Sequence, residues 1–147
     1  MELPMEPGRI TSCGAENLLN LRGDRYPREN ILIHEFSHCI HQQGLRSADP
    51  GFDKRLREIY DRAIEKGQWK DTYAATNVSE YWAEGVQDYF DCNNPPNGSH
   101  NDVNTREELA EHDPELFQLI DDVFKQSQYR YVRYNARHPA AGDSPAK

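Results

Sequence analysis

The segment His34-Glu35-Phe36-Ser37-His38 places two imidazoles and a carboxylate within five residues. On an α-helix, residues four apart lie on the same face one turn apart, so His34 and His38 can bind a single Zn²⁺ ion. Glu35 then stands beside the open position of the metal, where a carboxylate can take a proton from a bound water. This HExxH pattern therefore requires a helix whose polar face is turned inward, and it indicates hydrolytic zinc chemistry.

The residues around the motif favour such a helix. An apolar run precedes it, and Phe36 and Ile40 continue an apolar stripe at helical spacing. We expect the helix to run from about Glu29 to Gln43, with Gly44 as its natural stop. HExxH also arises by chance, and the alternative interpretation is a core helix whose two histidines only form hydrogen bonds.

Composition limits the partners of the chain. Its 147 residues suggest one domain over residues 1–135, followed by a flexible Pro/Ala/Gly-rich tail over 136–147. A net charge of −8 argues against nucleic acid or an anionic membrane as the main partner and favours a neutral or cationic peptide or protein substrate. No run of transmembrane length and no signal peptide is present, so the chain as given is expected to be soluble. The cellular compartment and the oligomeric state stay open, and an extracellular location stays open if the chain is a fragment.

The remaining segments predict a helix-dominated α+β fold with at most a small N-terminal sheet. Further helices are expected from Asp49 (N-cap, with Pro50 at N1) to before Gly67, over about Val78–Tyr89, after a capping box at Thr105–Glu108, and from Asp113-Pro114 onward. A short strand is expected at residues 9–12, and a strand or extended arm at residues 128–134. Of the three cysteines, Cys13 and Cys92 are either a disulfide pair or free thiols, the second being favoured.

A catalytic zinc site usually has three protein ligands, so the chain must supply a third. The metzincin pattern would place Gly at position 41 and His at position 44, whereas the sequence has His41 and Gly44. His41 is expected to lie in a pocket wall or in solvent. Glu80 and Glu84 are four apart and share a helix face, so one can bind zinc and the other can orient a histidine. The alternative is that Glu80 belongs to a helix cap and Glu84 is an exposed acid.

Two stretches resemble a known family. Residues 73–84, Tyr-Ala-Ala-Thr-Asn-Val-Ser-Glu-Tyr-Trp-Ala-Glu, and the HExxH segment resemble the gluzincin-type zinc metallopeptidases of the anthrax lethal factor catalytic-domain type. The resemblance implies a zincin-like core in which His34, His38 and Glu80 bind zinc. It also implies that Glu84 supports a ligand from behind and that Tyr73 assists catalysis. It covers residues 29–92 well and 113–126 loosely, whereas residues 1–28 match poorly.

The function expected from these residues is zinc-dependent peptide hydrolysis. Glu35 would act as general base on a zinc-activated water, and Tyr73 would donate a hydrogen bond to the developing oxyanion. A short N-terminal region leaves little chain for the edge strand that holds an extended substrate in related peptidases. The alternative is therefore a non-catalytic zinc-binding or interaction module derived from a peptidase fold.

Overall fold

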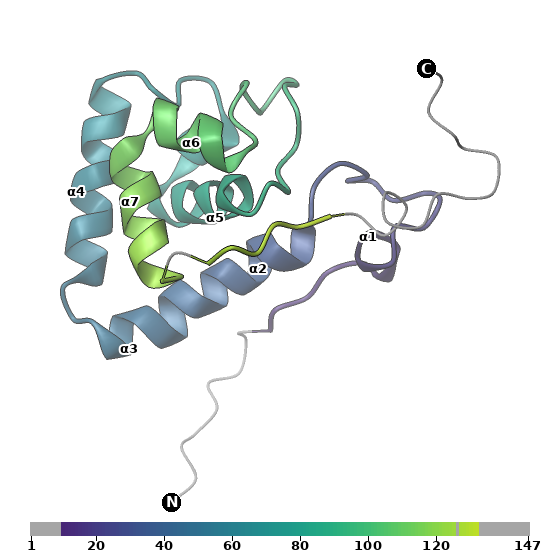
Figure 1. Cartoon of the computed structure of the whole chain (residues 1–147), viewed down its shortest axis with the longest axis horizontal. Helices are drawn as coiled ribbons and strands as arrows, with labels where there is room; N and C mark the ends of the chain where they lie inside the picture. The colour runs from purple at the N-terminus through teal and green to yellow at the C-terminus, as the bar shows by residue number, and fades with distance from the viewer. Residues whose placement is uncertain (1–9, 126, 133–147) are drawn as a thin grey trace, which may run out of the picture.

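A computed structural model describes residues 10–125 and 127–132, and this part of the chain is helix-dominated (Figure 1). The elements are α1 (Ala15–Leu18), α2 (Ile31–Cys39), a π-helix η1 (Ile40–Leu45), α3 (Arg46–Ala48), α4 (Phe52–Glu65), a 3₁₀-helix η2 (Tyr73–Thr76), α5 (Val78–Tyr89), α6 (Arg106–His112) and α7 (Pro114–Val123). No strand occurs among the described residues, so the strand expected at residues 9–12 is wrong over residues 10–12. The α+β expectation is corrected accordingly to a helical fold within residues 10–125 and 127–132.

The HExxH helix is longer than expected. It begins at Ile31, where the Asn30 side chain accepts the Ile33 backbone N–H as an N-cap, and it passes without interruption through η1 into α3. Gly44 is therefore not the stop that its residue type suggests. Glycine weakens a helix by only about 1 kcal/mol, and tertiary contacts override such a cost. Such contacts are present here: the ring of His41 packs against both Phe52 and Trp82, which also contact each other.

Helix α4 begins later than the sequence indicates. Asp49 does not cap it; the Asp49 carboxylate instead accepts the Gly51 backbone N–H and pairs with Arg55. The first helical residue is Phe52, whose ring is buried in the core. At the other end, Gly67 has a φ of +71°, a left-handed conformation that favours glycine, and the helix stops just before it, as expected.

Helix α5 lies at the centre of the fold. It contacts α2, α4, α6 and α7, and Figure 1 shows it surrounded by these helices. Its aromatic residues Tyr81, Trp82 and Tyr89 are fully buried, and its bounds agree with the prediction. The caps expected for α6 and α7 are confirmed: Thr105 forms a capping box with Glu108, and Asp113 caps a helix with proline in its first turn. These local rules are reliable because their partners lie within one turn.

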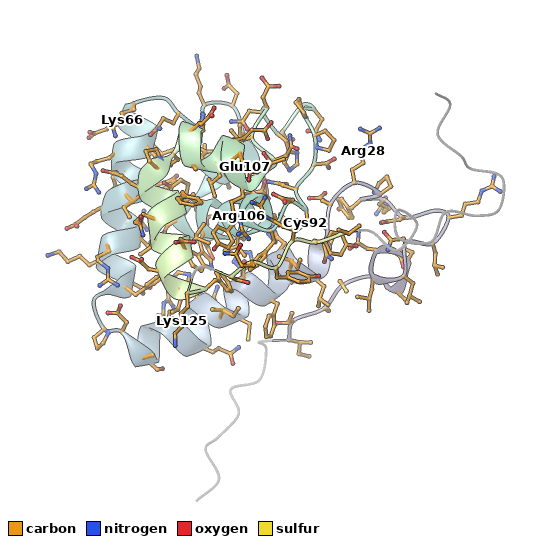
Figure 2. All side chains as sticks on the ribbon, in the orientation of Figure 1. Arg28, Lys66, Cys92, Arg106, Glu107 and Lys125 are labelled. Atoms are coloured by element: carbon orange, nitrogen blue, oxygen red, sulfur yellow. The ribbon has the colours of Figure 1, made fainter. Side chains whose placement is uncertain are left out.

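The C-terminal described segment lies across the helices as an extended arm, with no strand assigned over residues 127–132. The buried Arg106 guanidinium donates to the carbonyl oxygens of Tyr89, Ser127 and Tyr129, and its position is labelled in Figure 2. Residues 133–134 of the expected arm and the tail at 136–147 lie outside the described residues.

The three cysteines form no disulfide bond. Cys13, Cys39 and Cys92 are all free thiols, as favoured from the sequence. Among the described residues, none of the helices has both the length and the apolar character needed to cross a bilayer.

Candidate metal centre

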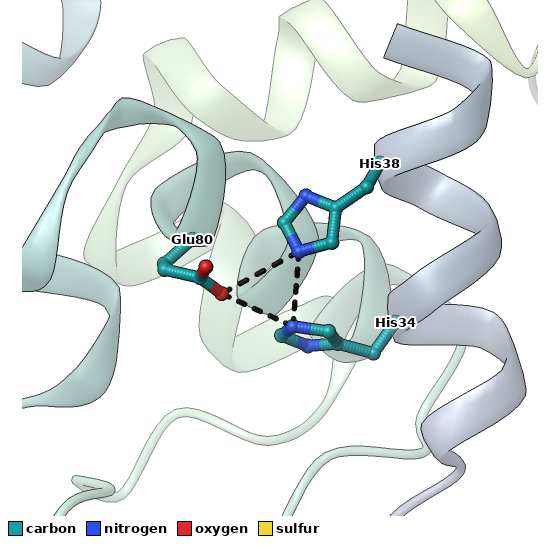
Figure 3. Close-up of side chains that lie close together, drawn as sticks. All are labelled: His34, His38 and Glu80. Atoms are coloured by element: carbon teal, nitrogen blue, oxygen red, sulfur yellow. Dashed lines mark hydrogen bonds and ion pairs between the residues drawn. The ribbon is translucent and has the colours of Figure 1, made fainter. Parts of the chain in front are cut away.

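Two helices that are far apart in sequence bring three side chains together. His34 and His38 project from α2, and Glu80 projects from the first turn of α5 toward them (Figure 3). Asn77 fixes this turn of α5, because its side-chain oxygen accepts the backbone N–H groups of Ser79 and Glu80. His34, His38 and Glu80 form the group among the described residues that could hold a metal ion.

The spacing of the three ligand atoms suits a tetrahedral zinc ion. His34 Nε2 lies 3.2 Å from His38 Nε2 and 3.1 Å from Glu80 Oε2, and His38 Nε2 lies 3.5 Å from the same oxygen. In a tetrahedral site with metal–ligand bonds of about 2.0–2.1 Å, neighbouring ligand atoms are separated by roughly 3.3 Å. The triangle of atoms therefore fits the ion without any movement of the helices.

The hydrogen bonds on the far side of His34 determine the tautomer of its ring. They leave the ring nitrogen nearest Glu80 and His38 with a free lone pair. The Gln87 amide N–H donates to the Asn30 carbonyl at 3.1 Å, so the Gln87 amide oxygen points toward His34. His34 Nδ1 lies 2.8 Å from that oxygen and 3.3 Å from Glu84 Oε1. Both neighbours are acceptors, so Nδ1 carries the proton and the Nε2 lone pair is directed at Glu80 Oε2. Two facing lone pairs need a positive charge between them, supplied either by a proton or by a metal ion.

His38 is oriented in the same manner by a hydroxyl group. Its Nδ1 lies 3.0 Å from Ser79 Oγ, which can accept the Nδ1 proton and leave Nε2 free to bind a metal. Each candidate imidazole ligand thus has a partner behind it, as ligating histidines in metal sites usually have.

The pKa values of the site residues also favour a positive charge between His34 and Glu80. Burial opposes protonation of His34, but hydrogen bonds with Glu80, Glu84 and Gln87 outweigh it and raise the pKa of His34 to about 10. Hydrogen bonds with His34 and His38 lower the pKa of Glu80 to about 2. Burial would raise the pKa of Glu84, yet hydrogen bonds with His100 and His34 bring it down to about 2. These shifts show that the three groups favour a positive charge among them.

Two cavities adjoin the triangle. One, of about 360 Å³, is lined by Ile10, Thr11, the three candidate ligands and part of α2; the other, of about 550 Å³, is lined by residues 12–14, Glu29, Ser99 and His100 among others. Glu35 and Tyr73 line both. A substrate at this boundary would therefore meet the Glu35 carboxylate, the Tyr73 hydroxyl and the metal position together.

Tyr73 comes from η2, immediately before α5. Its side chain is 43% exposed, and its ring centroid lies 6.3 Å from that of His34. Burial and the nearby Glu80 charge raise the pKa of Tyr73, which keeps the phenol protonated at neutral pH. A protonated phenol at a half-open cavity can donate a hydrogen bond to a developing oxyanion.

His41 is the clearest error of the sequence interpretation. It is expected in a pocket wall or in solvent, but it is only 3% exposed and lines neither of the two cavities beside the metal position. Its Nε2 is 2.7 Å from Asp53 Oδ1, and its ring contacts Phe52 and Trp82. His41 lies in the π-helix η1, where residues do not follow the spacing of a regular α-helix, so its position is not anticipated from the spacing of seven residues from His34.

Three polar partners of the site were missed in the sequence. Gln87 lies on the face of α5 that carries Glu80 and Glu84, at i+7 and i+3, so helical spacing could have indicated it. Ser79 immediately precedes Glu80 in α5, and its hydroxyl lies beside His38 Nδ1. His100 comes from the loop after α5 and reaches Glu84 at 3.3 Å, a contact that no local pattern indicates.

Comparison of the chain with protein-family models, with curated protein sequences and with solved structures found no match.

Proposed function

We propose that this protein is a zinc-dependent metallopeptidase of the gluzincin type, with His34, His38 and Glu80 as the metal ligands. The observation that carries the proposal is the triangle of ligand atoms, with sides of 3.1 to 3.5 Å, at the wall of an open cavity. The polar partners behind both imidazoles support the proposal, because ligating histidines usually have such partners. The resemblance of residues 73–84 to the lethal factor type agrees with this ligand set.

The side chains around the metal position have complementary roles. Zinc bound there would lower the pKa of a water ligand and polarise a substrate carbonyl. Glu35 would accept the proton of that water and return it to the leaving amine. The Tyr73 hydroxyl would donate to the oxyanion as it forms, an interaction that strengthens in the transition state. Glu84 and Gln87 would hold His34 in its ligating orientation.

A non-catalytic zinc module is the second candidate, and one observation favours it. The described residues contain no strand, so they supply no sheet edge along which an extended substrate could pair. A module of this kind would bind the metal and a partner without cleaving a peptide bond. The two candidates share the metal site and differ in chemistry alone.

The deciding experiment combines metal analysis with peptide digestion. The purified protein should contain about one equivalent of zinc, and it should cleave members of a peptide library in a reaction that a zinc chelator stops. Glu35→Gln should keep the zinc and lose at least about 10²-fold in turnover, because it retains the shape of the side chain and loses the base. Glu58→Gln, a change at an exposed acid on α4, serves as the matched control and should keep full activity.

The outcomes separate the candidates. Stoichiometric zinc without cleavage of any peptide favours the module, and absence of zinc binding refutes both. Full turnover by Glu35→Gln would show that Glu35 is not the base.

A further inference from the structure

The Glu84 carboxylate has a second imidazole on its far side. One oxygen, Oε1, lies 3.3 Å from His34 Nδ1, while Oε2 lies 3.3 Å from His100 Nε2 and 3.1 Å from Asn93 Nδ2. The Glu84 side chain is only 4% exposed, so its charge has to be compensated by these neighbours. Asn93 supplies a neutral donor, and His100 is the partner that can match the charge.

A tight turn brings His100 to this position. The Asn97 side-chain oxygen accepts the backbone N–H groups of Ser99 at 2.8 Å and His100 at 3.1 Å, and it lies 3.0 Å from His100 Nδ1. One amide oxygen thus holds both the backbone and the ring of His100. With Nδ1 directed at Asn97, the other ring nitrogen is directed at Glu84.

The same turn also contacts the segment that carries Tyr73. The backbone N–H of Tyr73 donates to the Ser99 carbonyl at 2.7 Å. Ser99, His100 and Tyr73 also line the larger cavity beside the metal position. Residues 97–100 therefore touch both the support of a candidate metal ligand and the backbone of the candidate oxyanion donor.

We propose that His100 is a positioning residue of the metal centre: it holds the Glu84 carboxylate in the orientation that fixes His34, and so strengthens metal binding. Asn93 also donates to Oε2, but a single neutral amide donor holds this oxygen less firmly than Asn93 and His100 do together, so without His100 the carboxylate can rotate more readily about its terminal bonds. Engaging Oε2 through His100 leaves Oε1 directed at His34 Nδ1 and keeps the His34 Nε2 lone pair on the metal position. This inference rests on the proposed zinc site, but not on catalysis.

The test measures zinc affinity by competition with a chromophoric chelator. Partners behind metal ligands typically change affinity by about 10–100-fold, and because His100 acts through Glu84 we expect His100→Leu to lose roughly 10-fold. His100→Gln keeps an N–H donor near the position of Nε2 and should recover most of that loss. His112→Leu is the matched control, because His112 packs against Trp69 at the end of α6, and it should bind zinc like the unchanged protein.

A further variant guards against misfolding. Asn97→Ala removes the acceptor that holds the turn but keeps the His100 side chain in the sequence. It should therefore lower zinc affinity, as His100→Leu does. The helix content measured by circular dichroism should stay unchanged. Should His100→Leu fail to fold, Asn97→Ala and His100→Gln decide the matter.

Two results would overturn the inference while leaving the zinc site intact. The first is unchanged zinc affinity in His100→Leu, or in Asn97→Ala if His100→Leu does not fold. The second is a loss of affinity in His100→Gln as large as the loss in His100→Leu. The second result would mean that the hydrogen bond is not the cause. Failure of the unchanged protein to bind zinc would instead refute the proposed function itself.

Discussion

At the scale of single residues, Glu80 and Glu84 show how position on one helix separates two chemical tasks. Both project from the same face of α5, and their spacing alone does not decide which of them is the candidate metal ligand. The structure places Glu80 Oε2 within 3.5 Å of both Nε2 atoms, whereas Glu84 lies behind His34 at 3.3 Å from Nδ1. One helical turn of α5 therefore separates a candidate ligand from the residue that supports it.

Asp88, one turn further along α5, yields a prediction about pH and stability. It is fully buried, its Oδ2 has no hydrogen-bond partner, and burial raises its pKa well above the ordinary value. The folded protein therefore keeps a proton that the unfolded chain releases above about pH 4. Because the native state keeps this proton, the contribution of Asp88 to stability falls as pH rises, by about 1.4 kcal/mol per pH unit until the folded pKa of Asp88 is reached.

Asp88→Asn carries no such proton, so we expect its stability relative to the unchanged protein to grow between pH 4 and pH 7. Urea unfolding in the presence of a chelator, at each pH unit, measures the difference. Asp61→Asn, at an exposed position on α4, should show little pH trend. A constant difference for Asp88→Asn at every pH would mean that Asp88 is ionised in the folded protein.

At the scale of helices, what the sequence reveals depends on how far away the deciding contact lies. The Thr105 and Asp113 caps and the bounds of α5 depend on partners within one turn, and each is read correctly. Passage of the HExxH helix through Gly44 depends on His41 packing against Phe52 and Trp82, up to 41 residues away. Local propensity has no access to such contacts.

The residues of the candidate site also differ in whether local sequence patterns can predict them. Helical spacing predicts the pairing of His34 with His38, and the resemblance to a known family implies Glu80 as the third ligand. Gln87 and His100 reach the site by contacts with partners 53 and 16 residues distant in sequence, which only the fold brings together.

The contact of α5 with α7 gives a prediction at this scale. A Cβ at Gly85 would lie 2.6 Å from Leu116 Cδ2 and 3.0 Å from Ile120 Cδ1, and both side chains are fully buried. Alanine is favoured over glycine in a helix by about 1 kcal/mol, but overpacking a core costs about 1–3 kcal/mol. We therefore expect Gly85→Ala to lower the free energy of unfolding by roughly 1 kcal/mol, as measured by urea denaturation.

Gly44→Ala is the matched control, because a Cβ there meets nothing within 4 Å. Within the same helical run as the HExxH motif it should be neutral or stabilise the protein by up to about 1 kcal/mol. A Gly85→Ala variant as stable as the unchanged protein would mean that α7 can move away from α5 at little cost.

At the scale of the whole molecule, a bound zinc ion would join α2 to α5, the helix about which the core is built. A ligand that binds only the folded state adds about 2.7 kcal/mol of stability at a free concentration 100 times its dissociation constant. With about 2–4 °C per kcal/mol for a domain of this size, we expect zinc to raise the melting temperature by roughly 5–10 °C over the chelated protein. Thermal unfolding with zinc and with a chelator at constant pH measures this shift.

His38→Gln should abolish most of the shift while leaving the chelated protein close to its usual melting temperature, since the His38 side chain is only partly buried. If zinc raised the melting temperature of His38→Gln as much as that of the unchanged protein, the ion would have to bind elsewhere. Glu80→Gln then tests whether α5 takes part. A zinc ion held by α2 alone would still raise the melting temperature of this variant. A shift that disappears equally in His38→Gln and Glu80→Gln is the result expected only when both helices hold the same ion.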